Sequence, residues 1–164
     1  MVIDLLLEDS GWNEDHLADL ARAACAAALT GLGLHPDRFE ISLLACDDAR
    51  IAALNTDFRG KPTPTNVLSW PAKIIALPTG RMPALPVADA GGPPIELGDI
   101  AIAYETCARE AADQGKPFDD HLSHLLIHAT LHLLGFDHIN DADADLMESI
   151  ETRILETLGI SDPY

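Results

Sequence analysis

The sequence is poor in cysteine and contains no long apolar run. Its three cysteines are odd in number, far apart in the chain and surrounded by alanine and aliphatic residues (Cys25, Cys46 and Cys107). This pattern excludes a disulfide framework or a CxxC metal site and favours buried free thiols. No stretch of about 18 apolar residues is present, and the acidic start MVIDLLLEDSGWNED lacks the basic region of a secretory signal. We therefore expect a soluble, cytoplasmic protein with no membrane partner.

Basic residues are scarce as well. The chain has 10 Lys and Arg against 27 Asp and Glu, which gives a formal net charge of −17. Binding to nucleic acid through an extended surface depends on many contacts of lysine and arginine with phosphates, so this composition argues against such a surface. Several basic residues nevertheless fall within the segment 59–81 (Arg59, Lys61, Lys73 and Arg81). A local cationic site and chance clustering in a polar loop are both open interpretations.

Apolar periodicity predicts an α+β fold that forms a single domain over residues 1–164. Strands are expected at 2–8, 39–46, 66–70 and 97–105, and helices at about 14–29, 48–60, 105–114, 118–134 and 141–158. Residues 71–96 hold most of the prolines and predict a long loop. We expect a mixed four-stranded sheet packed against about five helices.

The segment HATLHLLGFDH (128–138) contains three of the 7 histidines. On a helix, His128 and His132 are one turn apart on the same face, so their imidazoles can bind one ion. Gly135 can take the left-handed conformation that ends a helix, and the turn would bring His138 back toward the other two. Three protein ligands and one open position are typical of a catalytic zinc ion. We predict one zinc ion per chain, bound by His128, His132 and His138 at the C-terminal end of a central helix.

Other polar residues near this segment are weaker candidates. His121 and His124 lie on roughly the same helical face, and we expect them to be solvated or near the mouth of the site. Asp137 precedes the third histidine, where it would either orient an imidazole or cap the helix.

The histidine spacing is also that of the metzincin proteases, HExxHxxGxxH. Their general base is the glutamate after the first histidine, and here that position is Ala129. A peptidase with alanine there lacks the group that takes the proton from the zinc-bound water. Met147 lies where a Met-turn would be sought, but helical periodicity favours a core position for it. A zinc peptidase or other metal hydrolase stays an alternative that needs a base from elsewhere in the chain.

With alanine at this position, HATLHLLGFDH resembles the motif of the YbeY family, the bacterial endoribonucleases of rRNA maturation, usually HGxLHLxGYDH. The segment LNTDFRGKPTPTNVLSWP (54–71) is similar to that family's LNxxFRxxxxxTDVLSFP, and LGDIAIA (97–103) is similar to its LGDIxI strand. These blocks follow the family's order along the chain. The resemblance therefore extends from the second expected strand to the last expected helix.

The resemblance implies a single-strand-specific, metal-dependent endoribonuclease that acts in small-subunit (16S) rRNA maturation and ribosome quality control. Its substrate would be precursor rRNA, not DNA, and its partner the small subunit, a ribosomal protein or an assembly GTPase. The family's important arginine maps onto Arg59, so Arg59 and His128 are the expected catalytic residues. Bound zinc would lower the pKa of water to about 7, and the Arg59 guanidinium would neutralise charge on the phosphate.

A third interpretation is a non-catalytic ribosome assembly factor with a structural metal. The net charge of −17 favours it, because so acidic a protein can dock on a basic ribosomal protein rather than spread along RNA. Tests of the metal-loaded protein on RNA and on a peptide would separate the three interpretations.

Overall fold

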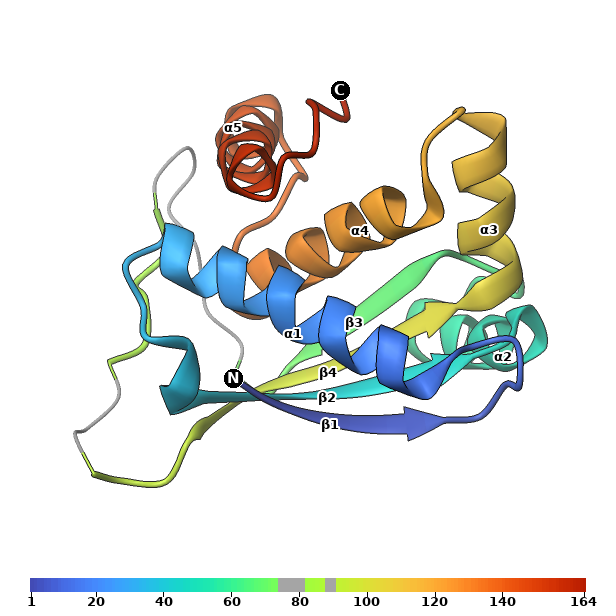
Figure 1. The fold of residues 1–164 in the computed structure, drawn as a ribbon, viewed down its shortest axis with the longest axis horizontal. Helices are drawn as coiled ribbons and strands as arrows, with labels where there is room; N and C mark the ends of the chain where they lie inside the picture. Colours follow the sequence, from blue (N-terminus) through green and yellow to red (C-terminus); the bar gives the residue numbers. More distant parts are fainter. Residues whose placement is uncertain (74–81, 88–90) are drawn as a thin grey trace.

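The computed structural model describes residues 1–73, 82–87 and 91–164, which Figure 1 shows as a ribbon. The strands are Val2–Leu7 (β1), Phe39–Cys46 (β2), Val67–Pro71 (β3) and Ile95–Ala103 (β4). The helices are Glu14–Gly31 (α1), Asp48–Arg59 (α2), Tyr104–Asp113 (α3), Phe118–Leu133 (α4) and Asp141–Thr157 (α5), with a short 3-10 helix at Pro36–Arg38. Every predicted helix and strand is present; the strand at 39–46 has the predicted boundaries, and the others differ by one to a few residues.

The predicted loop 71–96 is shorter at both ends, because β3 includes Pro71 and β4 begins at Ile95. Its described part at 82–87 contains no helix or strand. Residues 74–81 and 88–90 lie outside the described residues, and with them Arg81, one of the basic residues of the segment 59–81.

The sheet has the strand order β1-β2-β4-β3. Strands β1, β2 and β4 are parallel, and β3 runs antiparallel to β4 at the edge of the sheet. Gly98 permits the close approach of these two strands: its φ is +142°, and a Cβ there would lie 2.1 Å from the carbonyl oxygen of Trp70. The predicted α+β fold, a mixed four-stranded sheet with five α-helices, is confirmed.

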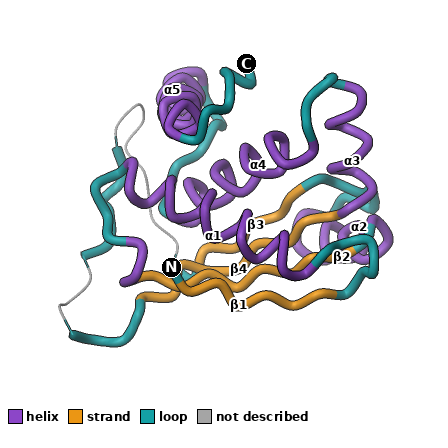
Figure 2. Tube along the Cα trace, in the orientation of Figure 1, coloured by secondary structure: helices purple, strands orange, loops and turns teal. Residues whose placement is uncertain are grey.

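The helices form layers on this sheet (Figures 1 and 2). Helices α1 and α4 lie side by side over one face, α5 lies above them, and α2 packs against the opposite face. The strands follow the same division, since Leu43 belongs to the large core under α1 and α4, while Leu44 packs on the α2 side. No helix of the described residues is long and apolar enough to span a bilayer.

Small residues let α1 pack closely on α4. Ala21, Ala24 and Ala28 are buried on one face of α1, and the hydroxyl of Thr130 in α4 donates to the sulfur of Cys25 at 3.4 Å. All three cysteines are buried and unpaired, as predicted, and burial raises the pKa of Cys25 to about 11. Thiols that ionise so reluctantly are inert as metal ligands and nucleophiles, so chemistry must come from other side chains.

Candidate metal centre

Helix α4 ends with the glycine turn that the sequence predicts. Gly135 has φ +105°, and the N–H of Phe136 donates to the carbonyl oxygen of Leu131 at 3.0 Å, which closes the last turn of the helix. This turn brings His138 back toward His128, with 5.4 Å between their ring centroids.

Three imidazoles converge at the C-terminal end of α4, two from the helix and one from the segment after it. The Nε2 atoms of His128 and His132 lie 3.0 Å apart, and the candidate ligand atoms of these two residues and His138 all lie within 4.8 Å of one another. Two nitrogens bound to a tetrahedral zinc ion at 2.0–2.1 Å lie about 3.3 Å apart. The spacing therefore fits a single ion, and the group can hold a metal.

Two of these imidazoles are oriented by hydrogen bonds from their Nδ1 atoms. His128 Nδ1–H donates to the carboxylate of Glu151, and His132 Nδ1–H donates to the carbonyl oxygen of Phe136 at 2.9 Å. A proton on Nδ1 leaves the Nε2 lone pair free to bind a metal. Both acceptors thus select the tautomer that a metal ligand needs.

The surroundings of His132 and Glu151 also determine whether these side chains are charged. Burial lowers the pKa of His132 to about 4, with His128 and His138 adding to the effect, so this imidazole is neutral at neutral pH. Burial opposes ionisation of Glu151, but hydrogen bonds from His124, His128 and Tyr164 outweigh it and hold the pKa of this carboxyl well below its usual value. His132 is therefore a neutral ligand, and Glu151, which bonds to His128, is a charged carboxylate.

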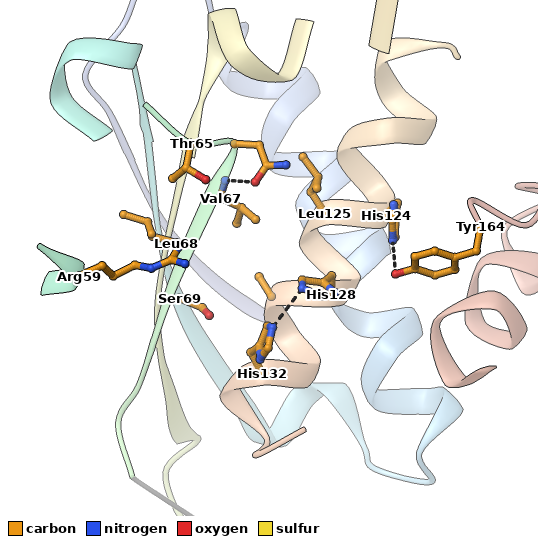
Figure 3. Close-up of a pocket in the computed structure, with 12 residues that line it drawn as sticks. Arg59, Thr65, Val67, Leu68, Ser69, His124, Leu125, His128, His132 and Tyr164 are labelled. Atoms are coloured by element: carbon orange, nitrogen blue, oxygen red, sulfur yellow. Dashed lines mark hydrogen bonds between the residues drawn. The ribbon is translucent and has the colours of Figure 1, made fainter. Parts of the chain in front are cut away.

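The α4 ligands open onto a pocket of about 470 Å³. Arg59, the last residue of α2, lines the same pocket as His128 and His132, and Figure 3 shows its side chain extending toward β3. The fold thus brings the predicted arginine and two predicted ligands to one cavity. Lys61 and Lys73 are exposed and do not belong to the described lining of this pocket.

Strand β3 and the residue before it supply further polar residues of the pocket. Asn66 and Ser69 line the cavity, and Asn66 donates to the carboxylate of Glu110 at 3.0 Å. The carbonyl oxygen of Asn66 and the N–H of Ala72 bond to β4, so the alternate residues, including Ser69, present their backbone groups at the free edge of the sheet. A signal existed in the sequence, because a short strand after a polar loop predicts an edge strand.

The two earlier histidines of α4 have different surroundings. His121 is 4% exposed and bonds through Nε2 to Glu110 at 3.0 Å, so the expectation that it is solvated or at the mouth of the site is wrong. It is buried because the first turn of α4 packs against α3. His124 lines the pocket, as expected, and its Nε2 lies 3.2 Å from the hydroxyl of Tyr164.

The Asp137 carboxylate accepts the backbone N–H of the next residue, His138, at 2.7 Å, and among the described residues it bonds to no imidazole. The carboxylate that orients a ligand is Glu151, which the sequence analysis missed. It falls four residues from Met147 and from Leu155, both buried on α5. A charged residue within a buried stripe needs a partner, and this was the available signal.

Comparison with known proteins agrees with these features. A family model described as "Endoribonuclease YbeY" matches residues 4–159. A protein of Jannaschia sp. with that name is 61% identical over 165 residues, covering 100% of both chains, and one of Ruegeria pomeroyi is 58% identical, covering 100% of this chain and 98% of the relative. The solution structure of a Thermotoga maritima protein has a similar fold, with a TM-score of 0.58 and 23% identity over 94% of this chain and 87% of that one. Because the match extends over nearly all of its length, this chain belongs to the YbeY family.

Proposed function

We propose that this chain, as one hydrolase domain over residues 1–164, is a zinc-dependent endoribonuclease specific for single strands. It acts in maturation of small-subunit (16S) rRNA and in ribosome quality control, in the cytoplasm. The observation that carries the proposal is that two of the three grouped imidazoles, those of His128 and His132, share one pocket with Arg59. Relatives at 50–61% identity are named endoribonucleases, which supports RNA as the substrate.

The chain's own residues would divide the work as follows. His128, His132 and His138 hold the zinc ion, which when bound supplies hydroxide at neutral pH and polarises a phosphate oxygen. Arg59 places its permanently charged, planar guanidinium against the scissile phosphate, where negative charge grows in the transition state. Ser69, at the free edge of β3, offers neutral donors and acceptors to the ribose and the neighbouring phosphates.

The pocket lining also bears on the peptidase alternative. Its described residues include no aspartate or glutamate, and the position of the metzincin base is Ala129, which is 1% exposed. The nearby carboxylate of Glu151 lies behind His128 and is fully buried, so it does not reach a substrate. The charged group that does line the pocket is the Arg59 guanidinium, which complements a phosphodiester rather than a neutral peptide bond, and this supports the nuclease.

The acidic composition supports delivery by a partner. With a net charge of −17, the protein repels most of an RNA chain, and few cations near the pocket can offset this. We propose that a protein of the small subunit, or an assembly GTPase, brings the enzyme to precursor rRNA.

The test measures cleavage of several substrates by protein of defined metal content. Protein stripped with a chelator and reloaded with one equivalent of zinc should cleave single-stranded RNA, and should leave the matching duplex, single-stranded DNA and a peptide intact. The stripped protein should be inactive. Peptide hydrolysis with intact RNA would replace the proposal with the peptidase. Binding to the small subunit without cleavage of any substrate would replace it with the assembly factor.

A further inference from the structure

Glu151 is a buried charge to which the proposed mechanism gives no direct role. It lies on the inward face of α5 between Met147 and Leu155, and its side chain is 0% exposed. Taking a carboxylate out of water costs several kcal/mol unless charged or hydrogen-bonding groups compensate for it. The structure must therefore contain groups that hold this carboxylate in place.

Three side chains bond to it, and all three line the pocket of the metal centre. His128 donates through Nδ1 to one carboxylate oxygen, and the Tyr164 hydroxyl donates to the other. Nε2 of His124 lies 3.4 Å from that second oxygen. Tyr164 is 58% exposed, but its hydroxyl reaches the buried carboxylate, and a tyrosine hydroxyl keeps its proton at neutral pH and can donate. Figure 3 shows Tyr164 beside His124, on the side of α4 that faces away from Arg59.

We infer that Glu151 is a positioning residue for the metal ligand His128, and that Tyr164, beyond the end of α5, holds Glu151 in place. The carboxylate keeps the proton on Nδ1, fixes the plane of the ring and makes Nε2 a better donor to the metal. Tyr164 occupies the second oxygen, so the carboxylate cannot rotate away from His128. The segment after α5 thereby becomes part of the metal centre.

This inference rests on the metal-binding part of the proposed function and not on RNA cleavage, so its test uses zinc alone. The dissociation constant for zinc is measured by competition with a chromogenic chelator. Glu151→Gln keeps the size of the side chain and removes its charge, and we expect zinc to bind 10- to 100-fold more weakly, roughly the range for loss of such a partner. Tyr164→Phe keeps the ring and removes the donor, and we expect a loss of about three- to tenfold.

The matched control is Glu156→Gln, the same change at an exposed position of α5, which should leave the affinity within twofold. A spectroscopic readout comes from cobalt(II), whose visible absorption depends on ligand geometry. The bands should shift in Glu151→Gln and stay unchanged in Glu156→Gln. Circular dichroism of each metal-free variant checks that it is folded.

Zinc affinity within twofold of the parent in folded Glu151→Gln would overturn the positioning role. If that variant does not fold, Tyr164→Phe decides, and unchanged affinity and an unchanged cobalt spectrum there would overturn the inference. A parent protein that binds zinc but leaves RNA intact would refute only the nuclease and leave the inference standing. A parent that binds no zinc would refute both.

Discussion

The two ends of helix α4 carry the same pair of groups in opposite arrangements. Near the start of the helix, the His121 side chain is 5% exposed and its partner Glu110 is 33% exposed. Near the end, the partner Glu151 is fully buried and the His128 side chain is 22% exposed. In the pair of His121 and Glu110 the imidazole is buried, and in the pair of His128 and Glu151 the carboxylate is buried.

The difference separates a structural pair from a functional one. Nδ1 of His121 is buried and has no hydrogen-bond partner among the described residues, and His121 does not belong to the candidate metal group. His128 uses Nδ1 on the buried carboxylate and turns Nε2 toward His132. An imidazole anchored from behind presents a lone pair to the pocket, whereas a buried imidazole only ties helices together. Four predictions test this contrast.

The largest effect is expected from His132→Ala. Two imidazoles rarely suffice to hold zinc, so the variant should retain less than about a tenth of an equivalent after purification without chelator. Elemental analysis of the purified protein measures this. His35→Ala, at an exposed histidine, is the control and should keep one equivalent. Full metal content in His132→Ala would place the ion elsewhere.

Arg59→Ala should act on the reaction and not on the metal. Loss of one group that stabilises transition-state charge costs roughly 100- to 1000-fold in rate, and we expect this drop in cleavage of single-stranded RNA. Zinc content and melting temperature should match those of the parent, because no ion-pair partner of Arg59 occurs among the described residues. Arg22→Ala, at an exposed position of α1, is the control. A fall in melting temperature like that of a core mutation would instead identify Arg59 as a structural residue.

The third prediction concerns the salt dependence of RNA binding, for which we expect an effect of intermediate size. Few cations lie near the pocket, so RNA binding should neutralise few phosphates, and the logarithm of the affinity should fall with the logarithm of salt concentration with a slope of about 1 to 3. A titration of fluorescent single-stranded RNA against zinc-loaded protein measures it. A slope steeper than about 5, or tight binding at physiological salt, would remove the need for a delivering partner.

The smallest effect on the metal should come from Glu110→Gln, on α3, whose carboxylate bonds to His121 near the start of α4. This change weakens the bonds of Glu110 to His121 and Asn66, and we expect the free energy of unfolding to drop by about 1 kcal/mol. Zinc affinity should stay within twofold of the parent, in contrast to Glu151→Gln. Chemical denaturation and chelator competition on the same samples provide both numbers. A tenfold loss of zinc affinity would show that the two ends of α4 are coupled.

Local sequence was enough to predict most elements and the convergence of His128, His132 and His138. The reason is that the i,i+4 spacing on a helix and the turn at Gly135 are properties of a few neighbouring residues. Family resemblance added Arg59, which no local pattern distinguishes from the other basic residues of the segment 59–81.

The roles of Glu151 and His121 could not be assigned from the sequence, because each depends on which helix packs against α4. Glu151 reaches His128 from α5, and His121 meets Glu110 from α3. The sequence by itself determined the helices, the strands and the triad of histidines, since these follow from backbone geometry and the period of apolar residues. Only the tertiary structure decided that Arg59, Ser69 and Tyr164 surround one pocket, because the burial of apolar faces on the sheet sets the contacts between distant segments.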